Sequence, residues 1–138
     1  MNTPPSNKAD AQSSAIPAWL FRVALVFACI AISYLAFTQF PENGPDLGWD
    51  KFNHAAAFYV LAFLVDFSIP RTRFGLAKFG MLIAYGICIE VVQYLLPYRE
   101  SSFEDLFADM VGILAYLLST PILARLPLLR ARWRLNPS

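Results

Sequence analysis

Four long apolar runs constrain this chain more than any other feature of its sequence. They cover residues 18–38, 51–69, 76–96 and 103–124. Each is close to the roughly 20 residues that a helix needs to cross a hydrocarbon core about 30 Å thick, and none alternates as a strand does. Hydrophobic residues make up 57% of the chain, above the roughly 45–50% of soluble domains. The sequence therefore predicts an all-α, polytopic membrane protein, a bundle of four transmembrane helices.

The segments outside these runs set the expected domain boundaries. Residues 1–17 are polar and contain prolines, and such a segment cannot bury enough apolar surface to offset the entropy of ordering it. We expect a disordered cytoplasmic tail at 1–17, a membrane domain at 18–124 and a basic cytoplasmic tail at 125–138. The basic tail either lies on an anionic inner leaflet or is only a stop signal that fixes the topology.

Small residues on the third apolar run predict close helix packing. Gly80, Ala84 and Cys88 follow one another at intervals of four residues, which places them on one side of a helix where a neighbouring backbone can approach. The other cysteine, Cys29, also stands in an apolar run, and neither cysteine has the spacing of a zinc site. Both cysteines are expected to be packing residues.

Basic and acidic residues collect at opposite ends of the predicted bundle. The basic end has nine Lys and Arg residues, whereas the acidic end has two, Lys51 and Arg99, together with eight acids. Because basic residues mark cytoplasmic loops, we expect an N-in/C-in, multi-pass protein of the bacterial cytoplasmic (inner) membrane. The formal net charge of +1 does not favour nucleic-acid binding, so the expected partner is the lipid bilayer. The nine basic residues are Lys8, Arg22, Arg71, Arg73, Lys78, Arg125, Arg130, Arg132 and Arg134.

Polar side chains from three of the predicted helices should meet at the acidic end. Charged and amide groups at membrane depth are rare unless they pair or line a cavity, so they mark candidate functional sites. Some of these groups stand at the start of the second helix, and others lie about two turns inside the third and fourth helices. One arginine stands in the loop that connects the third and fourth helices. A single outward-facing polar pocket is therefore predicted. Its residues are Asp50, Lys51, His54, Glu90, Gln93, Arg99, Asp105 and Asp109.

Three interpretations of this pocket remain open, and the first is structural. Lys51 and Arg99 would pair with Glu90 and Asp105. Hydrogen bonds from His54 and Gln93 would complete the network. Buried polar networks can fix helix packing in this way if every member is satisfied. The chain would then be a scaffold or an accessory subunit that docks against another membrane protein.

In the second interpretation the pocket is an active site. His54 would be a general acid or base oriented by Asp50 or Asp105, and the natural substrate class at the outer leaflet is a lipid-linked envelope or cell-wall precursor. One His with several carboxylates suits a divalent cation such as Mg²⁺, Mn²⁺ or Ca²⁺ better than a thiolate-seeking metal. The candidate catalytic residues, which are also the candidate metal ligands, are His54, Glu90, Asp105 and Asp109. The candidate substrate-binding residues are Asp50, Lys51, Gln93 and Arg99.

The third interpretation is binding or transport of a cation or a small polar ligand. Carboxylates within the membrane can form cation or proton paths. Near the basic end, however, Asp66 is the only acid within an apolar run. It is expected to pair with Arg71 or Arg73 at the membrane surface. No continuous relay is therefore visible between the two ends.

The same residues resemble a known family, the VanZ-like membrane proteins. The resemblance spans residues 48–118 and implies a small multi-helix envelope protein, in a family named for a member that lowers susceptibility to the glycopeptide teicoplanin. Two positions depart from the pattern: Asp109 stands where Asn is expected, and Tyr116 where a small residue is expected. The residues that carry the resemblance are Asp50, Lys51, His54, Glu90, Gln93, Pro97, Arg99, Ser101 or Ser102, Asp105 and Gly112.

Overall fold

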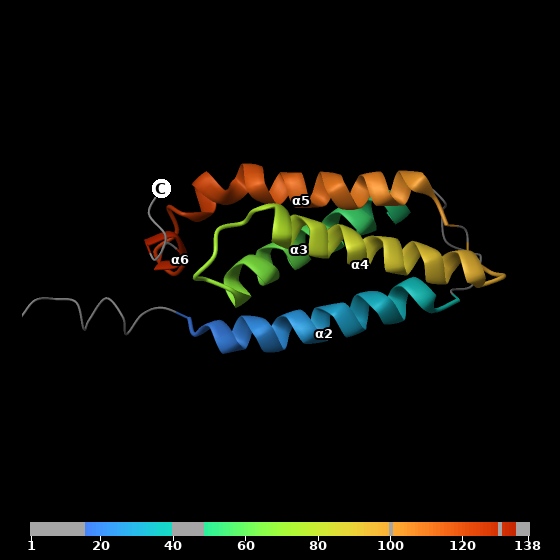
Figure 1. The fold of residues 1–138 in the computed structure, drawn as a ribbon, viewed down its shortest axis with the longest axis horizontal. Coiled ribbons are helices and arrows are strands. Elements are labelled where there is room, and N and C mark those ends of the chain that lie inside the picture. Colours follow the sequence, from blue (N-terminus) through green and yellow to red (C-terminus); the bar gives the residue numbers. More distant parts are fainter. Residues whose placement is uncertain (1–15, 40–48, 100, 130, 135–138) are drawn as a thin grey trace, which may run out of the picture.

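The structure, a computed structural model, describes residues 16–39, 49–99, 101–129 and 131–134. Most of the expected disordered tail lies outside these residues, as do the side chains of Trp49, Asp50, Ala131 and Arg134. The described part is helical and contains no strand, which confirms the predicted all-α bundle (Figure 1). Its helices are α2 (Ala18–Phe37), α3 (Trp49–Ser68), α4 (Leu76–Leu95), α5 (Phe103–Leu123) and the short α6 (Ala131–Arg134).

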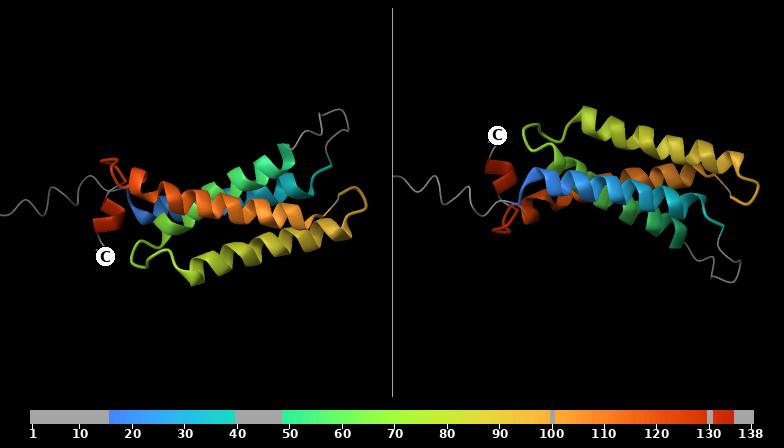
Figure 2. Two further views of the ribbon diagram at one scale, coloured as in Figure 1. Left: turned by 90° about the horizontal axis from the view of Figure 1, so that it is seen from above. Right: turned by 90° about the horizontal axis from the view of Figure 1, so that it is seen from below.

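Helix α3 is the centre of the bundle and contacts α2, α4 and α5 (Figures 1 and 2). Its residues Phe58, Leu61, Ala62 and Val65 are at most 2% exposed. Their spacing of three and four residues forms one apolar stripe on the helix. The stripe packs on α4 and α5, so the core lies along α3. The remaining members of the core are Leu82, Ile113 and Tyr116.

The long helices differ in how apolar they are. Helices α2, α4 and α5 are long and apolar enough to cross a membrane. Helix α3 has the same length of 20 residues but carries Lys51 and His54 near its start and Asp66 near its end. Neighbouring helices cover the end of α3 that carries Asp66, which is 2% exposed. The chain is thus a multi-pass membrane protein whose most polar long helix is also its most enclosed.

Two glycines allow close helix contacts, and neither is the one that the sequence pattern favoured. A Cβ atom at Gly112 would lie 2.1 Å from the carbonyl oxygen of Ala55, and one at Gly86 would lie 2.6 Å from Asp109 Oδ2. A Cβ atom at Gly80 would meet nothing within 4 Å. The expectation of close packing at Gly80 is therefore wrong. The backbone of α5 approaches α3 at Gly112, while Gly86 leaves room for a carboxylate between α4 and α5.

A buried ionic cluster holds the basic end together. Asp66 Oδ1 accepts hydrogen bonds from Lys78 Nζ at 2.8 Å and from Arg132 Nη2 at 2.6 Å. Asp66 Oδ2 accepts one from the Tyr116 hydroxyl at 2.7 Å. All four side chains are at most 6% exposed. The large residue at position 116 therefore has a structural use in this chain, because its hydroxyl group completes the shell around Asp66.

The C-terminal helix α6 supplies part of this cluster. Arg132 Nε donates to the Asp66 carbonyl at 2.9 Å and Nη1 donates to the Pro70 carbonyl at 3.0 Å. Trp133 packs its ring edge against Phe67 with 5.4 Å between centroids. Figure 1 shows α6 at the same end as the α3–α4 connection. At Arg132 the basic tail is thus neither a surface anchor nor a simple stop signal, because that side chain is built into the bundle.

Candidate functional site

The acidic end of the bundle brings together side chains from α3, α4 and α5. Atoms of His54, Glu90 and Asp105 that can bind a ligand all lie within 4.8 Å of one another. Asp105 is 5% exposed, and the other two side chains are partly buried. Three of the candidate catalytic residues therefore face a common point. The side chain of Asp50, also a candidate, lies outside the described part.

His54 is oriented by the fourth candidate, Asp109. Its Nδ1 lies 2.9 Å from Asp109 Oδ1, and Asp109 is only 1% exposed. The expected orienting carboxylates were Asp50 or Asp105, so the structure assigns this contact to a different acid. Because Asp109 contacts Nδ1, we assign any contact of the ring with Glu90, Asp105 or a ligand to Nε2. The missing side chain of Gly86 makes the position of Asp109 possible, as described above.

Glu90 links the site to the start of α5. Its Oε2 accepts a hydrogen bond from the backbone N–H of Ser102 at 3.0 Å. The Ser102 hydroxyl in turn accepts from the Glu104 N–H at 3.1 Å, so Ser102 is the N-cap of α5. Glu90 and Ser102 together fix the α4–α5 connection beside Asp105. The other carboxylate oxygen of Glu90, Oε1, is buried and has no hydrogen-bond partner within the described part.

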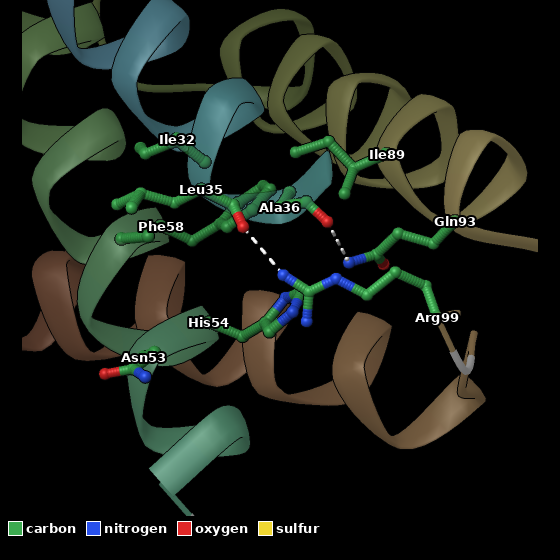
Figure 3. Close-up of a pocket in the computed structure, with 10 residues that line it drawn as sticks. Ile32, Leu35, Ala36, Asn53, His54, Phe58, Ile89, Gln93 and Arg99 are labelled. Carbon is green, nitrogen blue, oxygen red and sulfur yellow. Dashed lines mark hydrogen bonds between the residues drawn. The ribbon is translucent and has the colours of Figure 1, made fainter. Parts of the chain in front are cut away.

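A cavity of about 120 Å³ adjoins His54 and opens between α2, α3 and α4 (Figure 3). The sequence pattern gave no role to α2 here. The last turn of α2 carries carbonyl groups that no helical N–H can satisfy, and that is the only signal in the sequence for its involvement. The cavity is lined by Ile32, Leu35, Ala36, Asn53, His54, Ala57, Phe58, Ile89, Gln93 and Arg99.

Two candidate substrate-binding residues hold the end of α2. Gln93 Nε2 donates to the Ala36 carbonyl at 3.2 Å, and Arg99 Nη2 donates to the Leu35 carbonyl at 2.7 Å (Figure 3). Cationic and amide donors are favoured at this position because the C-terminus of a helix carries partial negative charge. Gln93 and Arg99 thus have a structural task, and both still line the cavity beside His54.

The ion pair of Lys51 lies at the edge of the site. Its ammonium group contacts the carboxylate of Glu104, and both side chains are more than half exposed. Exposed pairs of this kind contribute at most about 1 kcal/mol. Under the structural interpretation, Lys51 was expected to neutralise a buried carboxylate. The ion pair that the structure describes for Lys51 is with Glu104, an exposed acid one residue before Asp105.

A second hollow lies beside Glu90. It has a volume of about 420 Å³ and runs between α4 and the start of α5. Apart from Glu90 and two serines, its walls are apolar or aromatic. Glu90 therefore borders both this groove and the cluster with His54 and Asp105. The groove is lined by Ile87, Glu90, Val91, Tyr94, Ser101, Ser102, Phe103 and Leu106.

These features define a class of protein: a small multi-pass helical membrane protein with a polar site at one end of its bundle. Comparison with known families then places the chain more closely. It belongs to the VanZ/LLP1 family, whose family model matches residues 20–124. The match covers nearly all of α2 and the whole of α3, α4 and α5. No curated protein and no solved structure matches the chain.

Proposed function

We propose that this VanZ-like protein acts at the cell envelope on the polar headgroup of a lipid-linked precursor. The observation that carries the proposal is the oriented histidine: His54 is held through Nδ1 by the buried Asp109 and faces Glu90 and Asp105. A carboxylate that fixes the tautomer of a histidine prepares its other nitrogen to take or give a proton. His54 is assigned the role of general acid or base, and the role of Asp109 is to position it.

Buried oxygens without hydrogen-bond partners favour a ligand-binding site over a network that only fixes helix packing. Glu90 Oε1 and Asp109 Oδ2 are buried without a hydrogen-bond partner within the residues that the structure describes. A polar network that only fixes packing is favourable when every member is satisfied. The basic end supplies the comparison in the same chain, because both carboxylate oxygens of Asp66 accept hydrogen bonds. The acidic end lacks that completeness, which is typical of a site that receives a ligand.

The groove beside Glu90 favours a lipid-linked substrate. Its walls are almost wholly apolar, and it lies between two helices that are apolar enough to face lipid. A hydrocarbon chain in this groove would place its headgroup next to Glu90, where His54 and Asp105 also converge. Substrate could then enter from the bilayer without crossing the α2 side of the bundle. Glycopeptide tolerance would follow if the headgroup belongs to a cell-wall precursor.

The apolar core between the two polar ends argues against transport. His54 and Asp66 are twelve positions apart on α3, or about 18 Å along the helix axis. Between them lie Leu61 and Val65, which are at most 2% exposed, and Ile113 of α5 is fully buried beside them. A proton or cation path would need a continuous chain of polar groups or water across this layer. The arrangement supports a site open to one side of the membrane.

Turnover by the purified protein tests this proposal. The full chain in lipid nanodiscs would be incubated with undecaprenyl phosphate, undecaprenyl diphosphate and phosphatidylglycerol, with divalent cations present, and products would be identified by mass spectrometry. We expect a product from at least one of these lipids. His54→Ala should slow its formation by about 10²–10⁴-fold, the usual contribution of a general acid or base.

Glu104→Gln is the matched control, because Glu104 is an exposed acid on the first turn of α5 that pairs with Lys51. It should retain turnover close to that of the unmodified protein. Thermal unfolding of each variant shows whether the fold is kept. Absence of any product from all three lipids, or turnover that His54→Ala leaves unchanged, would overturn the proposed function.

A further inference from the structure

We infer that His54, Glu90 and Asp105 form a divalent-cation site in which Asp109 is a positioning residue and not a ligand. The sequence could offer four candidate ligands without ranking them. The geometry separates them: the three ligand atoms lie within 4.8 Å of one another, whereas Asp109 uses Oδ1 to hold His54 Nδ1. The role of the cation in turnover rests on the proposed function, but its binding can be measured without any substrate.

The ligand atoms come from three different helices, which makes the site a product of the fold. His54 stands on α3, Glu90 on α4 and Asp105 on α5. A ligand-binding His normally donates its other ring N–H to a carboxylate, which fixes the ring orientation and raises its basicity. The contact between His54 and Asp109 has this form, with a donor–acceptor distance of 2.9 Å. In the proposed site the cation is bound through the other ring nitrogen, Nε2.

Two buried oxygens without partners give independent support. Glu90 Oε1 and Gln93 Oε1 accept no hydrogen bond within the described residues. Gln93 is 4% exposed, and Figure 3 shows its amide pointing into the cavity that His54 lines. A buried acceptor that lacks a donor is costly, and a hydrated cation supplies both charge and water protons. The Gln93 oxygen therefore leaves a buried acceptor in the cavity beside His54.

The charge of the site points the same way. Three carboxylates, those of Glu90, Asp105 and Asp109, gather around one imidazole at the end of an apolar bundle. Like charges this close disfavour one another strongly in a weakly polar environment. A divalent cation reverses that local balance, and it would also give this negative site an affinity for the phosphate group of a lipid headgroup.

The ligand types narrow the class of cation. One imidazole and two carboxylates form a mixed nitrogen and oxygen set, and neither Cys29 nor Cys88 belongs to it. Such a set suits Mn²⁺, Mg²⁺, Ca²⁺ or Zn²⁺ and does not select thiolate-seeking metals. Three protein ligands leave coordination positions open for water or a substrate oxygen, as in catalytic metal sites.

Binding of Mn²⁺ alone tests the inference. The full chain in nanodiscs of uncharged lipid would be titrated with Mn²⁺ while electron paramagnetic resonance follows the free ion. One Mn²⁺ per chain should bind. Glu90→Gln and Asp105→Asn should abolish binding in the measurable range, whereas Asp109→Asn should weaken it by roughly 10–100-fold, as is usual for the partner of a ligating histidine. Glu104→Gln, next to Asp105 in the sequence, should bind as tightly as the unmodified chain.

The outcomes separate the site from diffuse attraction to acids. No Mn²⁺ binding by a folded chain, or equal losses in Glu104→Gln and Asp105→Asn, would overturn the inference. Asp109→Asn that loses binding as completely as Glu90→Gln would overturn the positioning role. If a variant unfolds, the unmodified chain is tested in its place by competition of Mg²⁺, Ca²⁺ and Zn²⁺ against Mn²⁺. The inference then requires stoichiometric displacement of the bound Mn²⁺. Lipid turnover that persists in chelator would refute a role of the cation in turnover and leave the proposed function standing.

Discussion

The contact at Gly112 gives the sharpest test of how α3 and α5 pack. A Cβ atom there would lie 2.1 Å from the carbonyl oxygen of Ala55 and 2.9 Å from its carbonyl carbon. Because the obstacle is backbone, no change of rotamer relieves it. In Gly112→Ala the two helices would have to separate by about 1 Å or more to regain ordinary van der Waals distances. That movement would loosen the core around Ile113 and Phe58.

The expected change in stability of Gly112→Ala is the difference between two opposing contributions. Overpacking of a core costs about 1–3 kcal/mol, and a rigid obstacle places Gly112→Ala at the upper end. The better helix propensity of Ala returns about 1 kcal/mol. A net loss of about 2 kcal/mol should lower the unfolding midpoint of a chain of 138 residues by about 4–10 °C. The measurement is thermal unfolding of the detergent-purified protein followed by tryptophan fluorescence.

Gly80→Ala is the control for this substitution. Gly80 is also a helical glycine, but a Cβ atom there meets nothing within 4 Å. The unfolding midpoint of Gly80→Ala should be unchanged or higher. Any gain in stability should be at most about 1 kcal/mol. The packing of α3 on α5 would be refuted if Gly112→Ala unfolded at the temperature of the unmodified protein, or if the two variants lost the same stability.

Two further predictions concern the basic end and the topology. Asp66→Asn removes the counter-ion shared by Lys78 and Arg132 and should cost about 3–5 kcal/mol, whereas the exposed Arg71→Gln should cost almost nothing; equal shifts of the unfolding midpoint would contradict the cluster. In a cysteine-free background, a membrane-impermeant maleimide should label Ser101→Cys in intact cells and Arg71→Cys only after permeabilisation. Labelling in the reverse order would refute the N-in/C-in orientation.

The helices themselves were within reach of the sequence. The runs predicted at 18–38 and 103–124 end within one residue of α2 and α5, because the bilayer thickness sets the length of an apolar run. The second run began two residues late, at 51, because α3 starts with Trp49 and Asp50. The charged Asp50 interrupts the apolar pattern at the helix start, so this boundary could not be read from hydropathy.

Partners across the bundle were much harder to predict. Position along a helix follows from residue number, and depth therefore identified His54, Glu90 and Asp105 as neighbours. Rotation of each helix about its axis depends on packing, which is why Asp109 as the partner of His54 was missed. The C-terminal end of α2 was not predicted to join the site for a related reason: unsatisfied carbonyls attract donors, but the sequence does not say which donors reach them.

The basic end shows the same limit. Asp66 was expected to pair with Arg71 or Arg73, the nearest arginines in the sequence. The structure gives it Lys78 on α4 and Arg132 on α6. A buried carboxylate takes the cations that packing brings into its shell, and α6 docks from 66 residues away. Sequence proximity is a poor guide here because the charge of the C-terminal segment does not show that Arg132 packs against Asp66.

The central claim is that the polar side chains of the acidic end hold a ligand and do not merely hold one another. An experimental density map of the purified chain in nanodiscs, with Mn²⁺ and undecaprenyl phosphate added, tests it most directly. We predict density in contact with His54, Glu90 and Asp105, with Asp109 still on His54 Nδ1 and Arg99 still on the Leu35 carbonyl. A map in which these carboxylates pair only with protein cations, with no added density between them, would contradict the claim.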